Sequence, residues 1–305
     1  MRKCSILIPT YNGKEILRAC LPSVIEAVAG RGNIDEILVL DNAGTDGTAD
    51  YLKSNYPDVN ILRLNENKAI FALNDGARAA AHDYLFFLND DMIVTSKCID
   101  SLLMHFDEPD AFAVTGKVYQ WDGKTVQAAR RRPAYHRGYF WYLPAKNPDD
   151  AGITLHALGG QSVFSKEKYL ELGGIDPLFS PFYHEDLDIS WRALRRGWKV
   201  IFEPRAEMIH KGAATAGKMY SQQDIRTIMQ KNMFLFMWKN IHDDGMIKEY
   251  RKWIIPRILR AAFNGDAVFL NGFRLALGQA AQARTAAGLI KDTKLTDSDV
   301  FNLFK

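Results

Sequence analysis

Short apolar segments alternate with segments of helical spacing in the first part of the chain, and this alternation constrains the fold more than any other feature. Five apolar runs rich in β-branched or aromatic residues are candidate strands, at residues 4–10, 36–42, 59–65, 83–89 and 111–118. Between the first two runs, apolar residues recur at helical spacing from Ile16 to Val28, with Pro22 as an expected kink. The repeated strand–helix–strand order predicts an α/β fold with a mostly parallel central sheet flanked by helices.

Polar side chains follow four of these candidate strands. In open parallel sheets, ligands bind beyond the carboxyl ends of the strands, so these ends are expected to share one edge. The residues are Thr10, Tyr11 and Asn12 after the first strand, Asp41 and Asn42 after the second, Asn65 and Asn67 after the third, and Asn89, Asp90 and Asp91 after the fourth. Their common position predicts a binding site at this edge.

A nucleotide is the first ligand to consider for such an edge. Neither G-x-G-x-x-G nor G-x-x-x-x-G-K-[ST] follows a strand, which disfavours a dinucleotide dehydrogenase and a P-loop NTPase. A bound diphosphate therefore needs another source of positive charge. A divalent cation held by carboxylates would supply it and would explain why Asp90 and Asp91 are neighbours, whereas the alternative is an ordinary turn after a strand.

Basic and aromatic residues are interleaved in segment 121–155, which is bounded by Pro and Gly and is expected to be a loop or flap. Such a mix can stack a sugar or a base, but neither net charge nor motif supports binding to nucleic acid. The paired glycines that follow, at 159/160 and 173/174, indicate either tight turns or close approach of the backbone to a ligand.

Three acidic residues, Glu185, Asp186 and Asp188, fall in the first turn of a predicted helix. A structural reason is available, because acids at a helix N-terminus complement the macrodipole and Asp188 can pair with Arg192. That reason leaves unexplained why the acids follow an aromatic approach rich in Gly and Pro. Further along, His210 ends a predicted strand, where a lone histidine is most often structural.

Composition limits the class of protein and its compartment. The chain has 305 residues and is 47% hydrophobic, as expected for a globular protein with a substantial core. Three cysteines without metal-like spacing favour a reducing compartment, and hence the cytoplasm. The apolar run before Pro9 is too short for a signal peptide, and no run of 18 apolar residues predicts a membrane span.

The C-terminal region is basic although the rest of the chain is acidic. Residues 211–305 hold 15 Lys and Arg against 8 Asp and Glu, which leaves 24 against 28 for residues 1–210. Segment 248–263 mixes these basic residues with apolar ones, as an interfacial segment does, and Pro256 is expected to interrupt a single helix there. The alternative is that its apolar residues, like MFLFMW at 233–238, pack on the core or on a second subunit.

Seven motifs in order resemble those of a known family. They are IPTYNG, DNAGTDGT, NENKAIFALNDGARAA, FFLNDD, GGQSVFSKEKYLELGGIDPLF, YHEDLDISWR and IFEPRAEMIH. This series resembles the family 2 inverting glycosyltransferases of the GT-A fold, within them the bacterial rhamnosyltransferase-like branch. The resemblance implies a GT-A domain over residues 1–212 and a helical C-terminal extension over 213–305.

The resemblance also implies roles for individual residues. Asp186 would be the general base, and Asp91 with His210 would bind Mn²⁺ or Mg²⁺. Gly159, Gly160 and Glu185 would contact the acceptor or the donor sugar. The nucleotide-sugar would meet Pro9, Thr10, Tyr11, Asn12, Asp41, Asn67, Asn89 and Asp90, with Asp41 accepting the imide N–H of a uracil or thymine. These residue types suit the chemistry, since an attacking hydroxyl must lose a proton and a leaving diphosphate needs its charge stabilised.

Two departures from the family pattern affect the expected contacts. Asn67, Lys68 and Ala69 stand where Asn-x-Gly is usual, so a close backbone approach is not expected there and Lys68 becomes a candidate phosphate contact. Ala43 and Gly44 follow Asn42 where D-N-x-S is usual, so a hydroxyl is missing.

The resulting hypothesis is a bacterial, cytoplasmic, metal-dependent inverting glycosyltransferase of polysaccharide or cell-wall biosynthesis. Its donor would be a UDP- or dTDP-sugar, with rhamnose favoured by the resemblance, and its acceptor a glycan or lipid-linked molecule. The C-terminal helices would serve peripheral contact with the inner face of the plasma membrane, or a homodimer. The rival hypotheses are a non-catalytic sugar-nucleotide-binding or scaffold protein of the same fold, and a nucleotidyltransferase, which the single glycine of IPTYNGKE disfavours.

Overall fold

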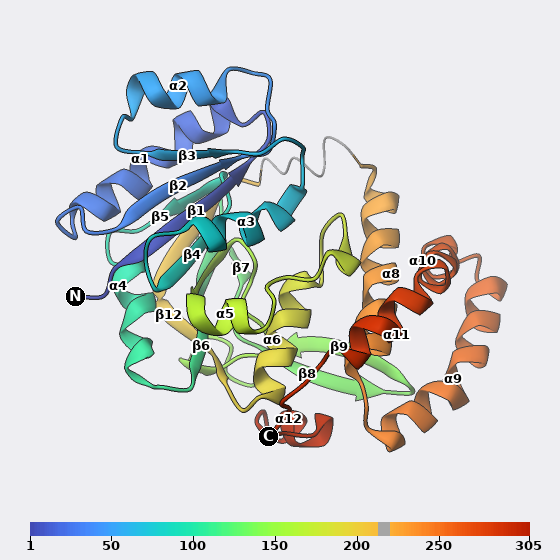
Figure 1. Ribbon diagram of the computed structural model, residues 1–305. Helices are drawn as coiled ribbons and strands as arrows, with labels where there is room; N and C mark the ends of the chain where they lie inside the picture. Colours follow the sequence, from blue (N-terminus) through green and yellow to red (C-terminus); the bar gives the residue numbers. More distant parts are fainter. Residues whose placement is uncertain (213–219) are drawn as a thin grey trace.

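The computed structural model describes residues 1–212 and 220–305 and has a mixed α/β architecture (Figure 1). Its strands are β1 (Cys4–Thr10), β2 (Glu36–Asp41), β3 (Asn60–Arg63), β4 (Tyr84–Leu88), β5 (Met92–Val94), β6 (Ala111–Gln120), β7 (Val126–Ala128), β8 (Arg131–His136), β9 (Tyr139–Pro144), β10 (Gly152–Ile153), β11 (Gln161–Ser165) and β12 (Lys199–His210). Its α-helices are α1 (Lys14–Ala29), α2 (Thr48–Asn55), α3 (Ala72–Ala79), α4 (Cys98–Leu103), α5 (Lys166–Glu171), α6 (Glu185–Arg195), α8 (Gln222–Asn240), α9 (Asp244–Phe263), α10 (Ala267–Gly278), α11 (Ala280–Gly288) and α12 (Asp297–Asn302).

One large sheet organises the molecule, in the order β10–β12–β6–β11–β4–β1–β2–β3. Strands β3, β2, β1 and β4 pair in parallel, so their carboxyl ends meet at one edge. Beyond β4 the sheet becomes mixed, because β11 runs antiparallel to both β4 and β6. The predicted α/β class is confirmed, and the five predicted strands correspond to β1, β2, β3, β4 and β6.

The sheet separates two hydrophobic cores because successive side chains of a strand point to opposite faces. From β1, Ile6 and Ile8 enter the core shared with α1 and α4. Leu7 enters the other core, which contains residues of α3, α5, α6 and α8. Helix covers both faces, as the near-continuous apolar character of β1 predicts.

The prediction of a loop or flap over 121–155 is wrong for about half of its length, which forms β7, β8, β9 and β10. Strands β8 and β9 form a separate antiparallel hairpin. Phe140 of β9 is fully buried, with its ring centroid 5.4 Å from that of Trp191 in α6 and 4.9 Å from that of Phe236 in α8. The hairpin therefore packs between α6 and the C-terminal helix α8.

The C-terminal region divides into a buried and an exposed part. Residues Met233–Met237 of α8 are buried in the core, which confirms the packing alternative for this segment. Helix α9 buries only Ala261 among its residues, and it continues from Asp244 to Phe263 with Pro256 inside, so the predicted interruption at Pro256 is wrong. The predicted boundary between 212 and 213 adjoins residues 213–219, which lie outside the described residues, and it stays a prediction. Within the described ranges, no helix combines the length and apolar character needed to cross a bilayer.

Candidate functional site

The ends of β1 and β4 are joined by polar contacts. The Thr10 hydroxyl donates to Asp90 Oδ2 at 2.7 Å. A Cβ atom at Gly13 would overlap Thr10 Oγ1 and come within 2.6 Å of Asp90 Oδ2, so this contact requires glycine in the IPTYNG motif. The end of β1 thus faces the NDD triplet, residues 89–91, as predicted. Pro9 and Thr10 are the last residues of this strand, and Tyr11 follows it.

Asp41, at the end of β2, is 1% exposed and has protein partners on both oxygens. Its Oδ1 accepts the Gly44 N–H at 2.8 Å, and its Oδ2 pairs with Arg63 Nη1 at 2.6 Å. Asn12 completes the same turn by accepting the Thr45 N–H at 2.7 Å. Sequence reasoning missed Arg63, although its position one strand away, in register with Asp41, could have indicated it.

The turn at residues 67–69 is held by Asn42. Its side-chain oxygen accepts the Lys68 N–H at 3.1 Å, and its amide donates to the Ala69 carbonyl at 3.2 Å. Ala69 has φ 48°, in the left-handed region that glycine adopts most easily. The backbone therefore keeps a glycine-like conformation although glycine is absent, and the Lys68 ammonium pairs with Asp75 at 3.2 Å.

Asp91 and His210 lie together at the far side of the NDD triplet. Asp91 precedes β5, His210 ends β12, and these two strands pair antiparallel. His210 Nε2 lies 3.0 Å from Asp91 Oδ2, and the Gln127 side chain lies within hydrogen-bonding distance of His210 Nδ1. The Lys211 N–H also donates to the Asp91 carbonyl, which fixes the two strand ends relative to each other.

This pair fits a divalent cation that takes its other ligands from outside the protein. It offers one carboxylate and one imidazole, both common ligands of Mn²⁺, and Gln127 holds the other ring nitrogen as an outer-shell partner does. In the described part of the chain, no group of three or more His, Cys, Asp and Glu could hold a metal. The remaining ligands would be phosphate oxygens and water, as is usual for Mg²⁺ bound with substrate phosphates.

Gly159 and Gly160 lie between the NDD triplet and the start of α6. The Asn89 N–H donates to the Gly160 carbonyl at 2.9 Å, and a Cβ atom at Gly160 would overlap the Asn89 side-chain amide. On the other side, a Cβ atom at Gly159 would lie 3.5 Å from Glu185 Oε1 and 3.7 Å from Asp186 Cβ. Asn89, the glycine pair and the two acids therefore form one continuous site.

The two acids at the start of α6 differ in their surroundings. Asp186 is half-buried, and its Oδ1 accepts the Leu187 N–H at 2.7 Å. Glu185 is buried, and its Oε2 has no hydrogen-bond partner among the described residues. Burial raises the pKa of Glu185 to about 8, and the neighbouring Asp186 carboxylate adds to this rise. The pair thus places a half-buried carboxyl group beside a buried one whose surroundings favour the protonated form.

A group of residues that sequence reasoning missed surrounds Asp186. Tyr142 of β9 places its ring 5.6 Å from the ring of His156 and 6.1 Å from that of His184. Burial raises the pKa of Tyr142, and the Asp186 charge adds to this rise. Tyr142 lies in segment 121–155, whose basic and aromatic residues indicated stacking on a sugar or a base, but only the packing of the β8–β9 hairpin places it beside His156 and His184.

Both histidines of this group are buried, which disfavours the charged form of the imidazole. Burial lowers the pKa of His184 to about 3, with a further contribution from His156, and burial also lowers the pKa of His156. The Nδ1 atoms of both rings have no hydrogen-bond partner among the described residues. Buried polar atoms of this kind normally have partners, so unpaired ones beside Asp186 indicate a ligand or water.

Comparison with known proteins identifies the family. The sequence matches the family model described as Glycosyl transferase family 2 over residues 5–173. The chain belongs to glycosyl transferase family 2. Family membership establishes the protein as a glycosyltransferase, and the matched residues include the ends of β1 to β4 and the glycine pair.

Curated relatives of this family 2 enzyme include two bacterial enzymes. An N-acetylglucosaminyl-diphospho-decaprenol L-rhamnosyltransferase of Mycobacterium tuberculosis is 26% identical over 213 residues, which is 60% of this chain and 68% of the relative. A poly-beta-1,6-N-acetyl-D-glucosamine synthase of Staphylococcus aureus is 24% identical over 223 residues, 72% of this chain and 52% of the synthase. The chain thus matches about half of the synthase.

Solved structures with the same fold are also glycosyltransferases. A mannosyltransferase from Pyrobaculum calidifontis, in complex with GDP-Man and Mn²⁺, is 16% identical and has a TM-score of 0.58. The match covers 94% of this chain and 85% of the mannosyltransferase. GalNAc-T7 with UDP, GalNAc and Mn²⁺ has a TM-score of 0.60 at 18% identity and covers 80% of this chain and 49% of its own. At such identities the likeness shows the fold, which is GT-A.

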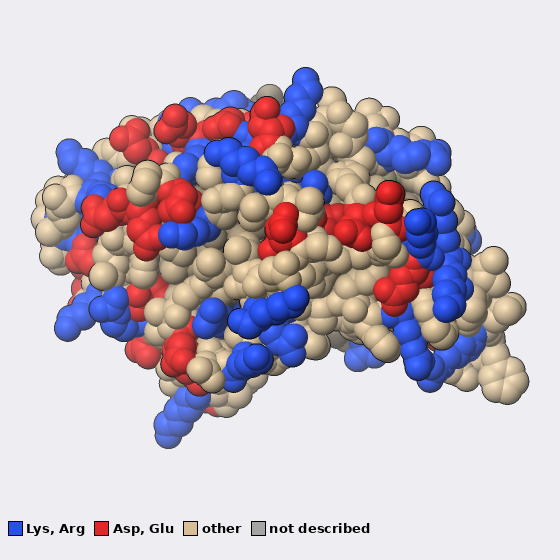
Figure 2. Space-filling view, turned by 90° about the horizontal axis from the view of Figure 1, so that it is seen from below, with Lys and Arg blue, Asp and Glu red and all other residues tan. Residues whose placement is uncertain are grey.

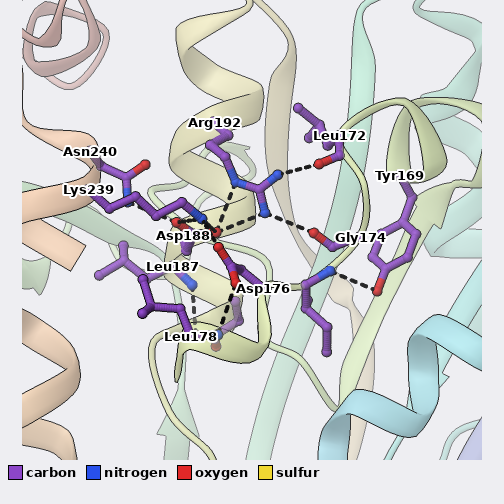
Figure 3. Close-up of polar contacts among 12 residues, drawn as sticks. Tyr169, Leu172, Gly174, Asp176, Leu178, Leu187, Asp188, Arg192, Lys239 and Asn240 are labelled. Carbon is purple, nitrogen blue, oxygen red and sulfur yellow. Dashed lines mark hydrogen bonds and ion pairs between the residues drawn. The ribbon is translucent and has the colours of Figure 1, made fainter. Parts of the chain in front are cut away.

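A buried polar network fixes the helix that carries Asp186 in this family 2 enzyme (Figure 3). Asp188, fully buried, accepts from Arg192 Nε at 2.9 Å and from Lys239 Nζ at 2.9 Å. Arg192 also donates to the Gly174 carbonyl at 2.8 Å, and Lys239 pairs with Asp176 at 2.7 Å. The predicted Asp188–Arg192 pair is confirmed, and the network joins α6 to the second glycine turn and to α8.

Proposed function

We propose that the enzyme transfers a sugar, with inversion, from a UDP- or dTDP-sugar to a hydroxyl group of a glycan or lipid-linked acceptor. The observation that carries this proposal is the continuity of the site. The glycine pair contacts Asn89 on one side and lies against Glu185 and Asp186 on the other. A donor at the strand ends would therefore present its sugar to Asp186.

The donor assignment rests on the strand ends of β1 and β2. The residues that would border the nucleoside are Thr10, Tyr11, Asn12 and Asp41, with Asn67 at the edge of the nucleoside. Asn89 and Asp90 would contact the ribose and phosphates. The Asp41 carboxylate already accepts from Gly44 and Arg63, but a carboxylate has about four acceptor positions, so an imide N–H of uracil or thymine can still be received. Rhamnose is the favoured sugar, and the mycobacterial relative is named as an L-rhamnosyltransferase.

The acceptor proposal follows the same relative, whose named substrate carries a decaprenol diphosphate. A lipid-linked acceptor would place the reaction at the cytoplasmic face of the membrane, in bacterial polysaccharide or cell-wall biosynthesis. The unpaired atoms of Glu185, His156 and His184 would bind hydroxyl groups of the reacting sugars, because neutral carboxyl and imidazole groups can each donate and accept.

Asp186 would act as the general base. The acceptor hydroxyl oxygen forms a bond to the anomeric carbon while its proton passes to Asp186, and the bond from that carbon to the phosphate oxygen breaks with its electron pair leaving on the nucleoside diphosphate. Attack opposite the leaving group inverts the anomeric centre.

Asp91 and His210 would hold Mn²⁺ or Mg²⁺. When bound, the cation would supply positive charge to the diphosphate as it leaves. Gln127 would orient the imidazole so that Nε2 faces the cation. This use of the pair explains why a carboxylate and an imidazole from distant strands meet at the polar edge.

The test is transfer and hydrolysis measured with a panel of nucleotide sugars, with and without Mn²⁺, on the wild type and on Asp186→Asn. We expect activity with UDP- or dTDP-sugars only, and a loss in Asp186→Asn on the order of 10²- to 10⁴-fold, as for removal of a positioned base. Calorimetry should show unchanged UDP or dTDP affinity in Asp186→Asn, and Asp58→Asn, an exposed acid, is the matched control.

Three results would contradict parts of the proposal. Equal binding of GDP or ADP would remove the pyrimidine assignment. Full activity in excess EDTA would remove the cation. Near-normal turnover of Asp186→Asn, with an inactive Glu185→Gln, would make Glu185 the base.

A further inference from the structure

Helix α9 presents an apolar stripe to solvent. Ile255, Leu259 and Phe263 follow one another at intervals of four residues, so they lie along one side of the helix. Their exposed fractions are 64%, 65% and 93%. Because burying apolar surface is favourable, three large side chains exposed in a row indicate a contact surface rather than scattered surface residues.

Basic residues surround this stripe, and acidic ones are missing from the same segment. Between Glu249 and Asp266 the sequence contains Arg251, Lys252, Arg257 and Arg260 and no Asp or Glu. Arg251, Lys252 and Arg260 are exposed. Figure 2 shows Lys and Arg side chains gathered at the right-hand end of the molecule, the end at which α9 lies in Figure 1.

The tip of the β8–β9 hairpin is fixed against the same helix. Gly138 packs so closely that an added Cβ atom would lie 2.6 Å from Tyr250 Cα, and its N–H donates to Glu249 Oε1 at 3.1 Å. The Arg257 guanidinium donates to the carbonyls of Arg137 and His136, both at 3.1 Å. These contacts join α9 and the hairpin tip into one continuous surface.

A cavity of about 640 Å³ opens between α9 and the hairpin tip. Arg137, Arg257 and Arg260 line it together with Trp141 and Trp253. The Arg137 guanidinium lies 5.1 Å from the centroid of the Trp253 ring. Burial lowers the pKa of Arg257, and the charges of Arg137 and Arg260 lower it further, so three cations crowd a cavity whose lining holds one acid, Asp266.

We infer that α9 and the hairpin tip dock on an anionic lipid bilayer, with Ile255, Leu259 and Phe263 entering the interface and the arginine-lined cavity taking lipid phosphate groups. Apolar side chains flanked by Lys and Arg and accompanied by Trp are the composition of interfacial helices. Guanidinium groups match phosphate geometry, and Arg137 and Arg260 would supply them, because Arg257 is held by the hairpin carbonyls. The surface is separate from the chemistry at Asp186 and does not depend on the proposed function.

Charge selects a bilayer over a second copy of the chain as the occupant. A two-fold contact places the same surface on both partners, so it would bring two sets of Arg251, Lys252 and Arg260 together. An anionic lipid surface instead neutralises these charges. The same surface therefore disfavours self-association and favours negatively charged lipid.

The experiment is flotation of the full chain with vesicles of phosphatidylglycerol and phosphatidylcholine, and with vesicles of phosphatidylcholine alone. We expect binding to the anionic vesicles at low salt, at least tenfold weaker binding to neutral vesicles, and weakening as salt screens the charges. Leu259→Ser/Phe263→Ser and Arg251→Glu/Lys252→Glu should each reduce binding at least tenfold. These residues are exposed, so the fold should be kept, as circular dichroism can check.

Matched variants elsewhere separate this surface from general effects. Leu170→Ser/Leu289→Ser removes exposed apolar side chains from other elements, and Lys53→Glu/Lys124→Glu makes the same charge change; both should float like the wild type. Asp186→Asn should also float normally, so a failed base assignment leaves this result unaffected. Absence of flotation at low salt would overturn the inference, as would a dimer in ultracentrifugation that Leu259→Ser/Phe263→Ser abolishes.

Discussion

At the scale of single residues, Glu185 should make stability depend on pH. Its pKa is about 8 in the folded protein against 4.5 as the ordinary value, so between these values the folded state keeps a proton that the unfolded state has lost. The stabilisation is complete below pH 4.5 and is lost as the pH rises through about 8. His184, with a pKa of about 3 against 6.5, gives the opposite slope below pH 6.5.

Between pH 6.5 and 8, therefore, the pH dependence of stability reflects the ionisation of Glu185 and not that of His184. We expect the free energy of unfolding of the wild type to fall there relative to Glu185→Gln, with a limiting slope of about 1.4 kcal/mol per pH unit. Urea unfolding at several pH values measures this, and Glu171→Gln, an exposed acid, is the control. Parallel pH profiles for the wild type and Glu185→Gln would show that Glu185 ionises normally.

At the scale of elements, the buried charges around Asp188 should be worth more than surface pairs. Replacing Asp188 with Asn leaves Arg192 and Lys239 buried with less compensating charge, which should cost about 3–5 kcal/mol of unfolding free energy. Asp75→Asn, which breaks half-exposed pairs with Lys68 and Arg78, should cost about 1 kcal/mol or less. Denaturant unfolding of both variants makes the comparison, and equal losses would contradict the role given to burial.

The elements also show which features a sequence can predict. Strands β1 to β4 and their polar ends were predictable because each is encoded by a local run of apolar residues followed by turn formers. Asp91 and His210 meet because β5 and β12 pair, a long-range event that only the family resemblance anticipated. The β8–β9 hairpin was wrongly predicted to be a loop because its basic and aromatic residues are typical of one. Only the packing of Phe140 against α6 and α8 shows that it is part of the core.

Backbone conformation was harder still to predict. Ala69 replaces the glycine of the family pattern, which predicts a changed turn, yet the Asn42 side chain holds the turn in the left-handed conformation. Tyr142, His156 and His184 were missed for a related reason. Their burial beside Asp186 depends on the hairpin and on α6 together, so no single segment carries the signal.

At the scale of the whole molecule, α8 belongs to the same core as the sheet. Phe234 and Phe236 are fully buried, in one cluster with Leu7 of β1 and Phe87 of β4. Lys239 and Asn240 of α8 contact Asp188, two residues from the proposed general base Asp186. Family membership is carried by residues 5–173, but the position of Asp186 depends on a helix far beyond them.

Because α8 shares this core, we predict that α8 unfolds together with the sheet and not as a separate unit. Cooperative units exchange their amide hydrogens together, so residues 233–237 of α8 should exchange as slowly as β4 under native conditions. Helix α9, which buries only Ala261, should exchange faster. Hydrogen exchange followed by mass spectrometry can compare the three segments. Fast exchange in α8 with slow exchange in β4 would show instead that the C-terminal region is a separate folding unit. In that case Asp188 would keep α6 in place without the contacts from α8.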